Sequence, residues 1–371
     1  MATKTFTTLF PNATNTELIK DVGQIPYYLS LKQSFSGNLV AQNIIIDEKI
    51  FHQIEGLNII HLSKLINWKI AGFIYILFNA KKIDWLNLYH IDKKTYYWSW
   101  IYKSINPEGK IYLKGDIDYR TCDMFDEKEK RRIVLNKCLK FSSIFSVESH
   151  SIKRRLEKHT KRKILVVPNG SSLIQSDMDI EKVITNKQNI FLTVGRLGTK
   201  QKATELLMEA FALIADDCDW NLRLVGSITK EFDHYIKDFF SVHPKLRDRI
   251  YVVGEINDRE VLKKEYERAR VFVLPSRWES FGISLVEAIT FGCRIIGTNV
   301  IPPIQEITNN ERYGQIVIPD CISDLKNAMI KEFKHEYSIT ETQSIMEYAK
   351  KNYSWNAICD QLQLYMEANG E

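Results

Sequence analysis

Apolar residues occur along the chain in two rhythms, as short continuous runs and as longer stretches with helical spacing. The runs are rich in β-branched and aromatic residues, which is typical of strands. Helical patterns lie between most of them, for example at residues 18–33 and 126–141. This alternation indicates βαβ units and parallel sheets. In the first half it predicts strands at about Thr5–Phe10, Leu39–Ile46, Leu57–His61, Trp85–Tyr89, Lys110–Leu113, Ser143–Val147 and Ile164–Val167.

A second, more regular series begins near residue 189, after a polar stretch at Ser171–Gln188 that predicts a linker. Its first strand leads into a helix at 203–217, in which Leu206, Leu207, Ala210, Phe211 and Ile214 share one face. Further strands are predicted at 221–227, 249–256, 270–276, 294–300 and 315–319, and further helices at 259–269, 284–292, 341–354 and 355–369.

The length of 371 residues favours two domains. We expect a first lobe at 1–170, a second at 171–350 and a terminal helical segment at 351–371. With 44% hydrophobic and 26% charged residues, the composition is that of an ordinary globular protein. The six cysteines form no CxxC pair, so reduced thiols are expected.

The N-terminus lacks a basic region followed by a long apolar run, so we expect no signal peptide and a cytoplasmic location. The most apolar stretch, Leu65–Asn79, contains Lys69 and is shorter than the roughly 20 residues of a membrane span. It predicts a buried helix.

The net charge of +5 is unevenly spread. Ser151–Lys163 carries seven Lys or Arg residues against one Glu. Such a segment is one of two things: a solvated helix face, or a surface that attracts a phosphate-bearing acceptor or an anionic membrane. Attraction to a membrane would make the protein peripheral at the inner face of that membrane. The chain has no nucleic-acid motif, so nucleic acid is not an expected partner.

The segment Pro275–Ala288, PSRWESFGISLVEA, has the strongest chemical pattern. An apolar strand ends at Pro275, a short loop follows, and a helix begins near Ser284. Ligands of open parallel sheets bind beyond the carboxyl ends of strands, where helix N-termini attract anions. Glu279 in the loop and Glu287 in the helix can accept hydrogen bonds from sugar hydroxyls.

This segment resembles the Glu-x7-Glu motif of retaining family-4 glycosyltransferases. The resemblance implies the α/β fold called GT-B, two Rossmann-like lobes with parallel sheets that face each other across an interdomain cleft. It also implies that Glu279 contacts the donor sugar and that Glu287 holds the ribose. The amides of Phe281, Gly282 and Ile283 would then lie near the sugar and the diphosphate.

The segment TVGRLGTKQKATELL matches a second motif of the family. There, a strand ends in Gly-Arg and a Lys follows before a helix, and both cations hold the donor diphosphate. Gly195 and Arg196 match. Lys202 matches by its spacing, with Ala203 where Gly is usual, and Lys200 is an alternative. Fixed cations also stabilise the charge that grows on the leaving diphosphate. The resemblance extends over about Ile164–Met366.

The first lobe matches the family only in outline. Gly23 is placed just before the first helix, where the family has a loop that approaches the donor phosphate and the acceptor. The family often has a His at a strand end near the reacting sugar, but here that stretch has none. Lys114 or Asp116 lies in its place, and Asp116 is the candidate catalytic residue. His90, at another strand end, is an alternative.

No metal site is expected, because no ligands cluster in the sequence. The triplets Asp116/Asp118 and Asp177/Asp179 spell Asp-x-Asp, which binds a metal in the other large glycosyltransferase fold, but such triplets are frequent by chance. We also expect no cofactor other than the nucleotide-sugar donor.

The resemblance implies a metal-independent, retaining transfer of a sugar from a nucleotide-sugar donor to a hydroxyl of a saccharide, lipid-linked or protein-linked acceptor. UDP-sugars are favoured over GDP-sugars, and bacterial surface polysaccharide or glycoconjugate assembly is the expected setting. Two alternatives remain at this point. One is a phosphorylase or sugar-nucleotide epimerase of the same fold, and the other is a non-catalytic GT-B-fold partner subunit of a glycosyltransferase complex.

Overall fold

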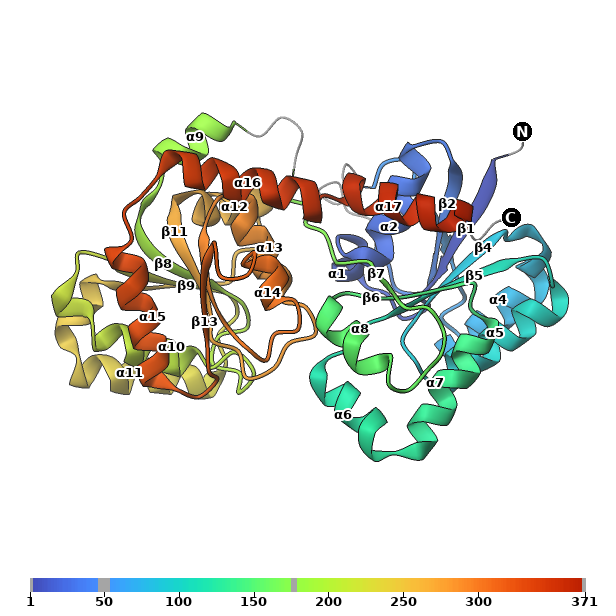
Figure 1. The fold of residues 1–371 in the computed structure, drawn as a ribbon, viewed down its shortest axis with the longest axis horizontal. Helices are drawn as coiled ribbons and strands as arrows, with labels where there is room; N and C mark the ends of the chain where they lie inside the picture. The colour runs from blue at the N-terminus through green and yellow to red at the C-terminus, as the bar shows by residue number, and fades with distance from the viewer. Residues whose placement is uncertain (1–2, 46–53, 175–178, 369–371) are drawn as a thin grey trace. The chain divides into compact units, whose positions relative to one another are not determined.

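The computed structural model describes residues 3–45, 54–174 and 179–368 (Figure 1). The chain divides into two compact units. Unit 1 comprises Met1–Ser172 and Tyr353–Glu371, and unit 2 comprises Leu173–Asn352. Each unit is built around one parallel sheet.

Unit 1 has a seven-stranded sheet with the order β3-β2-β1-β4-β5-β6-β7. All its strand pairs are parallel. Chain connections leave β1 toward β2 on one side and reach β4 on the other, which creates a switch point between β1 and β4. The strands are β1 Lys4–Leu9, β2 Phe35–Ala41, β3 Asn58–His61, β4 Trp85–Tyr89, β5 Lys110–Gly115, β6 Ile144–Val147 and β7 Leu165–Val166.

Helices cover both faces of this sheet because successive strand residues point to opposite faces. On β4, Trp85 packs in a cluster with α2 and α17, whereas Leu86 packs in a cluster with α4, α5 and α7. The helices are α1 Asn15–Leu18, α2 Asp21–Leu31, α4 Trp68–Asn79, α5 Lys93–Ile105, α6 Tyr119–Glu127, α7 Glu129–Phe141, α8 His150–Leu156 and α17 Trp355–Ala368, with a 3-10 turn at Ala80–Lys82.

Unit 2 has a six-stranded parallel sheet with the order β10-β9-β8-β11-β12-β13. Its switch point lies between β8 and β11. The strands are β8 Gln188–Val194, β9 Asn221–Val225, β10 Ile250–Gly254, β11 Ala269–Leu274, β12 Arg294–Thr298 and β13 Gly314–Val317.

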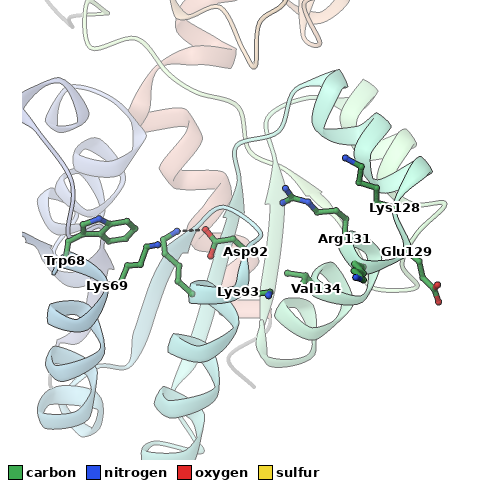
Figure 2. A pocket seen from close by; sticks show the side chains of 10 residues that line it. Trp68, Lys69, Asp92, Lys93, Lys128, Glu129, Arg131 and Val134 are labelled. Carbon is green, nitrogen blue, oxygen red and sulfur yellow. Dashed lines mark hydrogen bonds and ion pairs between the residues drawn. The ribbon is translucent and has the colours of Figure 1, made fainter.

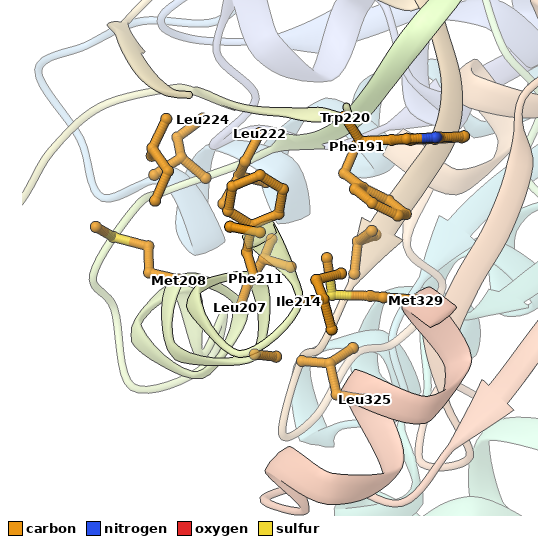
Figure 3. Packing of buried hydrophobic residues seen from close by; sticks show 14 of the residues in the cluster. Phe191, Leu207, Met208, Phe211, Ile214, Trp220, Leu222, Leu224, Leu325 and Met329 are labelled. Carbon is orange, nitrogen blue, oxygen red and sulfur yellow. The ribbon is translucent and has the colours of Figure 1, made fainter. Parts of the chain in front are cut away.

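The helices of unit 2 pack on this sheet through large apolar side chains. On one face, Leu207 and Phe211 of α10 meet Phe191 of β8, and Leu325 and Met329 of α15 join the same cluster (Figure 3). The helices are α9 Ile180–Thr185, α10 Thr204–Ala212, α11 Lys230–Val242, α12 Arg259–Arg268, α13 Ile283–Thr290, α14 Ile304–Ile307, α15 Ile322–Lys334 and α16 Ile339–Tyr353, with 3-10 turns at Ala215–Asp217 and Pro244–Asp248.

A predicted strand and a predicted linker differ from the structure. The strand predicted at Leu39–Ile46 runs instead over Phe35–Ala41, and Ile46 lies outside the described residues. Its start is not a continuous apolar run because Ser36 is exposed and Gly37 is required: an added Cβ at Gly37 would lie 2.1 Å from the carbonyl oxygen of Pro26. The predicted linker at Ser171–Gln188 contains the short helix α9, which Asp179 caps by accepting a hydrogen bond from the Lys182 amide.

The helix predicted at Leu65–Asn79 is confirmed as α4, but the expectation that it is buried is wrong. Only its side toward the core, with Ala71, Gly72 and Ile76, is buried. Phe78 is 75% exposed. The continuous apolar run therefore gave no sign that one face of the helix lies in the core and the other is in contact with solvent. None of the helices in the described part of the chain has the length and apolar character of a membrane span.

Candidate functional site

The loops after β8 and β11 emerge side by side at the switch point of unit 2. These two strands are paired through Val271 with Phe191 and through Phe272 with Leu192. The chain continues from β8 into Gly195 and Arg196, and from β11 into Pro275 and Ser276. The topology thus brings the two strongest sequence segments together at the sheet edge where ligands of this fold class bind.

Lys202 and Glu279 form the centre of this site. The Nζ atom of Lys202 lies 2.5 Å from Oε1 of Glu279, and the Ser276 hydroxyl donates to the same oxygen at 2.8 Å. The side chains of Lys202 and Glu279 are only 15% and 9% exposed. A charge-assisted contact with so little solvent fixes both groups in one geometry. The alternative, Lys200, is exposed, and its carbonyl oxygen accepts a hydrogen bond from Arg277.

The absence of a side chain at Gly195 leaves space for the side chain of Lys202. A Cβ on Gly195 would lie 3.2 Å from Cε of Lys202, so a side chain there would press on the lysine stem. Ala203, the N-cap residue before α10, lies in the left-handed region at φ 49°. This conformation costs a non-glycine residue about 1–2 kcal/mol, which the surrounding structure must offset.

Arg196 is exposed and is held from one side. Its Nη2 atom donates to Oε1 of Gln201 at 2.9 Å, and Nε2 of Gln201 donates to the carbonyl oxygen of Trp278 at 2.9 Å. The Arg277 amide donates to the Gln201 carbonyl oxygen at 2.8 Å. Gln201 therefore ties the Arg196 loop to the Glu279 loop.

Arg277 fastens the second loop to the body of unit 2. Its guanidinium lies 2.7 Å from Glu205 of α10 and 2.5 Å from Asp320. Burial acts against the charge of Arg277, but the hydrogen bonds to these two carboxylates outweigh it and raise the arginine pKa. The loop is thus anchored through the Arg277 side chain.

Gly282 caps the N-terminus of α13 with φ 81°, a conformation that glycine adopts without cost. Phe281 before it is buried, and Ile283 begins the helix. The N-terminal amides of α13 and the positive end of the helix dipole favour an anion. Ile283, the first residue of α13, lies four positions after Glu279.

Glu287, on α13, is oriented by a tyrosine from α12. The hydroxyl of Tyr266 donates to Oε2 of Glu287 at 2.8 Å. Burial, together with the negative charge of Glu287, raises the pKa of Tyr266 well above its usual value, so the hydroxyl remains a donor. Glu279 and Glu287 thus belong to one segment but have separate partners.

Unit 1 carries a different cluster at the carboxyl ends of its strands. Lys114, at the end of β5, is fully buried. Its Nζ atom lies 3.2 Å from Asp21 and 3.3 Å from Glu148, and it donates to Oδ1 of Asn169 at 2.5 Å. Burial lowers the lysine pKa, but the neighbouring carboxylates outweigh it and raise the pKa. Asp116, two residues later, is exposed.

Two further candidates from the sequence, Gly23 and His90, lie in unit 1. The prediction that Gly23 precedes the first helix is wrong, because it lies within α2 and is buried. A Cβ there would be 2.3 Å from the carbonyl oxygen of Leu18, so the glycine permits close packing with α1. His90 follows β4 with φ 65° and contacts the ring of Phe10.

The titration of Glu148 gives a prediction for stability. Burial raises its pKa from 4.5 to about 8; Lys114 lowers it, while Asp116 and Asp21 add to the rise. The folded state therefore holds a proton that the unfolded state releases between these values, so its contribution to stability is lost as the pH rises from 4.5 to about 8. We expect the melting temperature of the wild type to fall over this range more steeply than that of Glu148→Gln. Glu129→Gln, at an exposed position, is the control and should show the pH dependence of the wild type. An equal fall of melting temperature with pH in the wild type and in Glu148→Gln would contradict this assignment.

The described residues contain no group of three or more His, Cys, Asp or Glu side chains that could hold a metal. Asp118 caps α6 by accepting from the Thr121 amide, and Asp179 caps α9. Asp177 lies outside the described residues. The Asp-x-Asp triplets thus include two helix caps.

Sequence reasoning missed the residues that position the charged groups. Ser276, Gln201 and Arg277 lie in the two motifs, and their polar character beside a strand end was an available signal. Tyr266 is 21 positions from Glu287, and no local pattern connects the two.

Residues 175–352 match the family model described as Glycosyl transferases group 1. The chain is 26% identical over 297 residues to an uncharacterized glycosyltransferase of Methanocaldococcus jannaschii, a match that covers 74% of this chain and 71% of the relative. It is 26% identical over 203 residues to the GDP-mannose:cellobiosyl-diphosphopolyprenol alpha-mannosyltransferase of Xanthomonas oryzae, covering 52% of each. The chain thus spans only about half the length of that second relative.

Among solved structures, the chain is similar to a sucrose-phosphate synthase from Thermosynechococcus elongatus. The TM-score is 0.71 at 18% identity, with 98% of this chain and 99% of the other covered. Together with the two parallel sheets, this confirms the predicted α/β fold of the GT-B class with two Rossmann-like lobes.

Proposed function

We propose that this chain, which has a glycosyl transferases group 1 domain at residues 175–352, moves a sugar from a nucleotide-sugar donor to a hydroxyl acceptor with retention of configuration. The observation that carries the proposal is the meeting of Arg196, Lys202 and Glu279 with the start of α13 at the ends of β8 and β11. Two cations and a helix N-terminus suit a diphosphate, and an adjacent carboxylate suits a sugar.

The roles follow from the position of each group. Arg196 and Lys202 hold the diphosphate, and the amides of Phe281, Gly282 and Ile283 lie beside it. Glu279 accepts hydrogen bonds from the donor sugar, and Glu287 accepts them from the ribose hydroxyls. Gly195 leaves the space in which the Lys202 stem runs.

In the reaction, the bond between the anomeric carbon and the diphosphate oxygen breaks, and a bond to the acceptor oxygen forms on the same face. The acceptor proton passes to the departing diphosphate. The charge that grows on the diphosphate meets Arg196 and Lys202, which are already in place, so no metal is required in this scheme. In unit 1, Asp116 and the N-terminal turn of α2 with Gly23 lie at the carboxyl edge of the sheet, and we assign this edge to the acceptor.

A lipid-linked acceptor is proposed because the Xanthomonas relative is named for a cellobiosyl-diphosphopolyprenol acceptor. Surface polysaccharide or glycoconjugate assembly on the inner face of a membrane is therefore the proposed role. The proposed donor is a UDP-sugar in preference to a GDP-sugar.

A screen of UDP-, GDP- and ADP-sugars tests the function. With EDTA present, we expect at least one donor to raise the melting temperature of the protein. We also expect the protein to release the nucleoside diphosphate from that donor. Binding without any turnover in the presence of saccharide and lipid-linked acceptors would favour a non-catalytic subunit. Stabilisation by none of the donors would contradict the proposal.

Replacing Tyr266 by Phe tests the role of Glu287. We expect the donor KM to rise about tenfold with little change in kcat, because a lost hydrogen bond to a charged group corresponds to about 1.5 kcal/mol. Tyr235→Phe is a matched control, since Tyr235 donates to Glu209 at 2.7 Å elsewhere in unit 2. Equal KM values in the two variants would remove the assignment of Glu287 to the ribose.

A further inference from the structure

The outer face of α4 exposes an apolar stripe. Ile70, Ile74, Leu77 and Phe78 are spaced by four, three and one residues, so they share one side of the helix. Their exposed fractions are 55%, 38%, 44% and 75%. Exposed apolar side chains gathered on one face of a helix make that face a candidate interaction site.

The charged side chains on this stretch of the chain are all of one sign. Residues 62–83 contain four lysines, Lys64, Lys69, Lys81 and Lys82, and no Asp or Glu. An apolar helical face bordered by lysines is typical of helices that lie in the interface of an anionic membrane. A second copy of this chain would bring the same positive charges to the surface, so charge complementarity favours an anionic partner.

Helix α5 extends the surface. Trp98 of α5 packs against α4, since its ring nitrogen donates to the carbonyl oxygen of Lys69 at 3.3 Å and its ring contacts Trp68. The outer side of α5 presents Tyr97 and Trp100, both about half exposed. These rings have the apolar body and polar edge that favour the headgroup region.

A basic pocket lies beside the stripe, between the starts of α4, α5 and α7 (Figure 2). Six of its lining residues are cationic and two, Asp92 and Glu129, are acidic, which gives a net charge of +4. The cations are Lys69, Lys93, Lys94, Lys128, Lys130 and Arg131. Lys94 is paired with Asp92 at 2.7 Å. The remaining cations suit phosphate groups.

We propose that the outer face of α4 and α5 and this basic pocket form a docking surface for an anionic lipid membrane. Ile74, Leu77 and Phe78 enter the apolar region, and the pocket cations hold lipid phosphates. Asp92 follows the end of β4 by three residues, so docked lipid headgroups lie near the carboxyl edge of the unit 1 sheet. The inference extends the proposed function, because a membrane-bound acceptor would then be close to that edge.

The basic segment Ser151–Lys163 lacks this combination. Its apolar residues, Ile152 and Leu156, are fully buried, and Arg155 pairs with Asp123 at 2.8 Å. It therefore has no exposed apolar side chain that could insert into a membrane. The segment therefore provides a control with the same type of charge and no apolar stripe.

Sedimentation of the full chain with vesicles tests the surface. We expect binding to phosphatidylcholine vesicles that contain phosphatidylglycerol, and little binding to phosphatidylcholine alone. Ile74→Gln/Leu77→Gln/Phe78→Gln should lower the partition coefficient at least ~10-fold. Lys93→Gln/Lys130→Gln/Arg131→Gln should lower it by about fivefold per charge. The matched control, Arg154→Gln/Lys161→Gln/Lys163→Gln, should stay within about twofold of the wild type.

Several outcomes would overturn the proposal. These are no binding by the wild type, unchanged binding by the first two variants, or an equal loss in the control. Self-association that the apolar variant abolishes, without vesicle binding, would identify a dimer surface instead. Amide exchange of the wild type is a second readout that needs no variant: vesicles should slow exchange in 65–82, and no change there would also overturn the proposal. Because all these tests measure binding, the surface and the transfer activity can fail separately.

Discussion

Replacing Arg196 by Ala should lower kcat/KM for sugar transfer by about 10²–10³, the loss typical when one fixed group that stabilises transition-state charge is removed. Arg196 is exposed and donates to Gln201, so its loss should leave the fold almost unchanged. The measurement is steady-state transfer with the donor found by screening, together with the melting temperature of each variant.

Lys200→Ala is the matched control for this experiment. Lys200 is an exposed cation four residues from Arg196, but the group that it contributes to the loop is its backbone carbonyl. We expect nearly wild-type activity. A variant at Arg196 with wild-type turnover, or equal losses at both positions, would contradict the assignment of the diphosphate site.

Replacing Lys114 by Met should destabilise unit 1 by about 3–5 kcal/mol, because it leaves the little-exposed Asp21 carboxylate without its cation and removes the hydrogen bond to Asn169. Lys114 is fully buried beside Asp21, Glu148 and Asn169. For a unit of this size the expected fall in melting temperature is about 10 °C. Chemical denaturation followed by circular dichroism gives the free energy of unfolding directly.

The control for Lys114 is Lys110→Met, four residues earlier on the same strand and half-buried. It should change stability by less than about 1 kcal/mol. If the loss at Lys114 arises from uncompensated charge, then Asp21→Asn in the Lys114→Met background should recover part of it. If the changes in the free energy of unfolding of the two single variants simply add in the double variant, Lys114 stabilises by packing alone.

The sequence predicted the regular part of the fold well because strands buried on both faces appear as short apolar runs. The strand at Ala269–Leu274 is an example. The helix at Thr204–Ala212 was likewise predicted, from apolar residues at helical spacing. Where the pattern misled, another constraint decided the structure. At Phe35–Ala41, the exposed Ser36 and the glycine required beside Pro26 interrupt the apolar run. At Trp68–Asn79, an apolar run was taken for a buried helix although one side faces solvent.

The candidate site was predictable where its residues lie within one loop and its strand end. Glu279, Gly282 and Glu287 belong to one segment, and Arg196 and Lys202 to another. Their contact across 77 positions required the knowledge that β8 and β11 are neighbours. The contacts of Lys114 were not predictable, since Asp21, Glu148 and Asn169 come from three separate parts of the chain.

Calorimetric titration of UDP and GDP into the full chain in the presence of EDTA tests the central claim most directly, because it requires neither the donor sugar nor the acceptor. We predict that at least one of them binds, that Arg196→Ala weakens this binding at least ~10-fold, equivalent to about 1.4 kcal/mol, and that Lys200→Ala leaves it unchanged. Absence of binding by both nucleotides, or equally tight binding by Arg196→Ala and the wild type, would contradict a nucleotide-sugar site at the ends of β8 and β11.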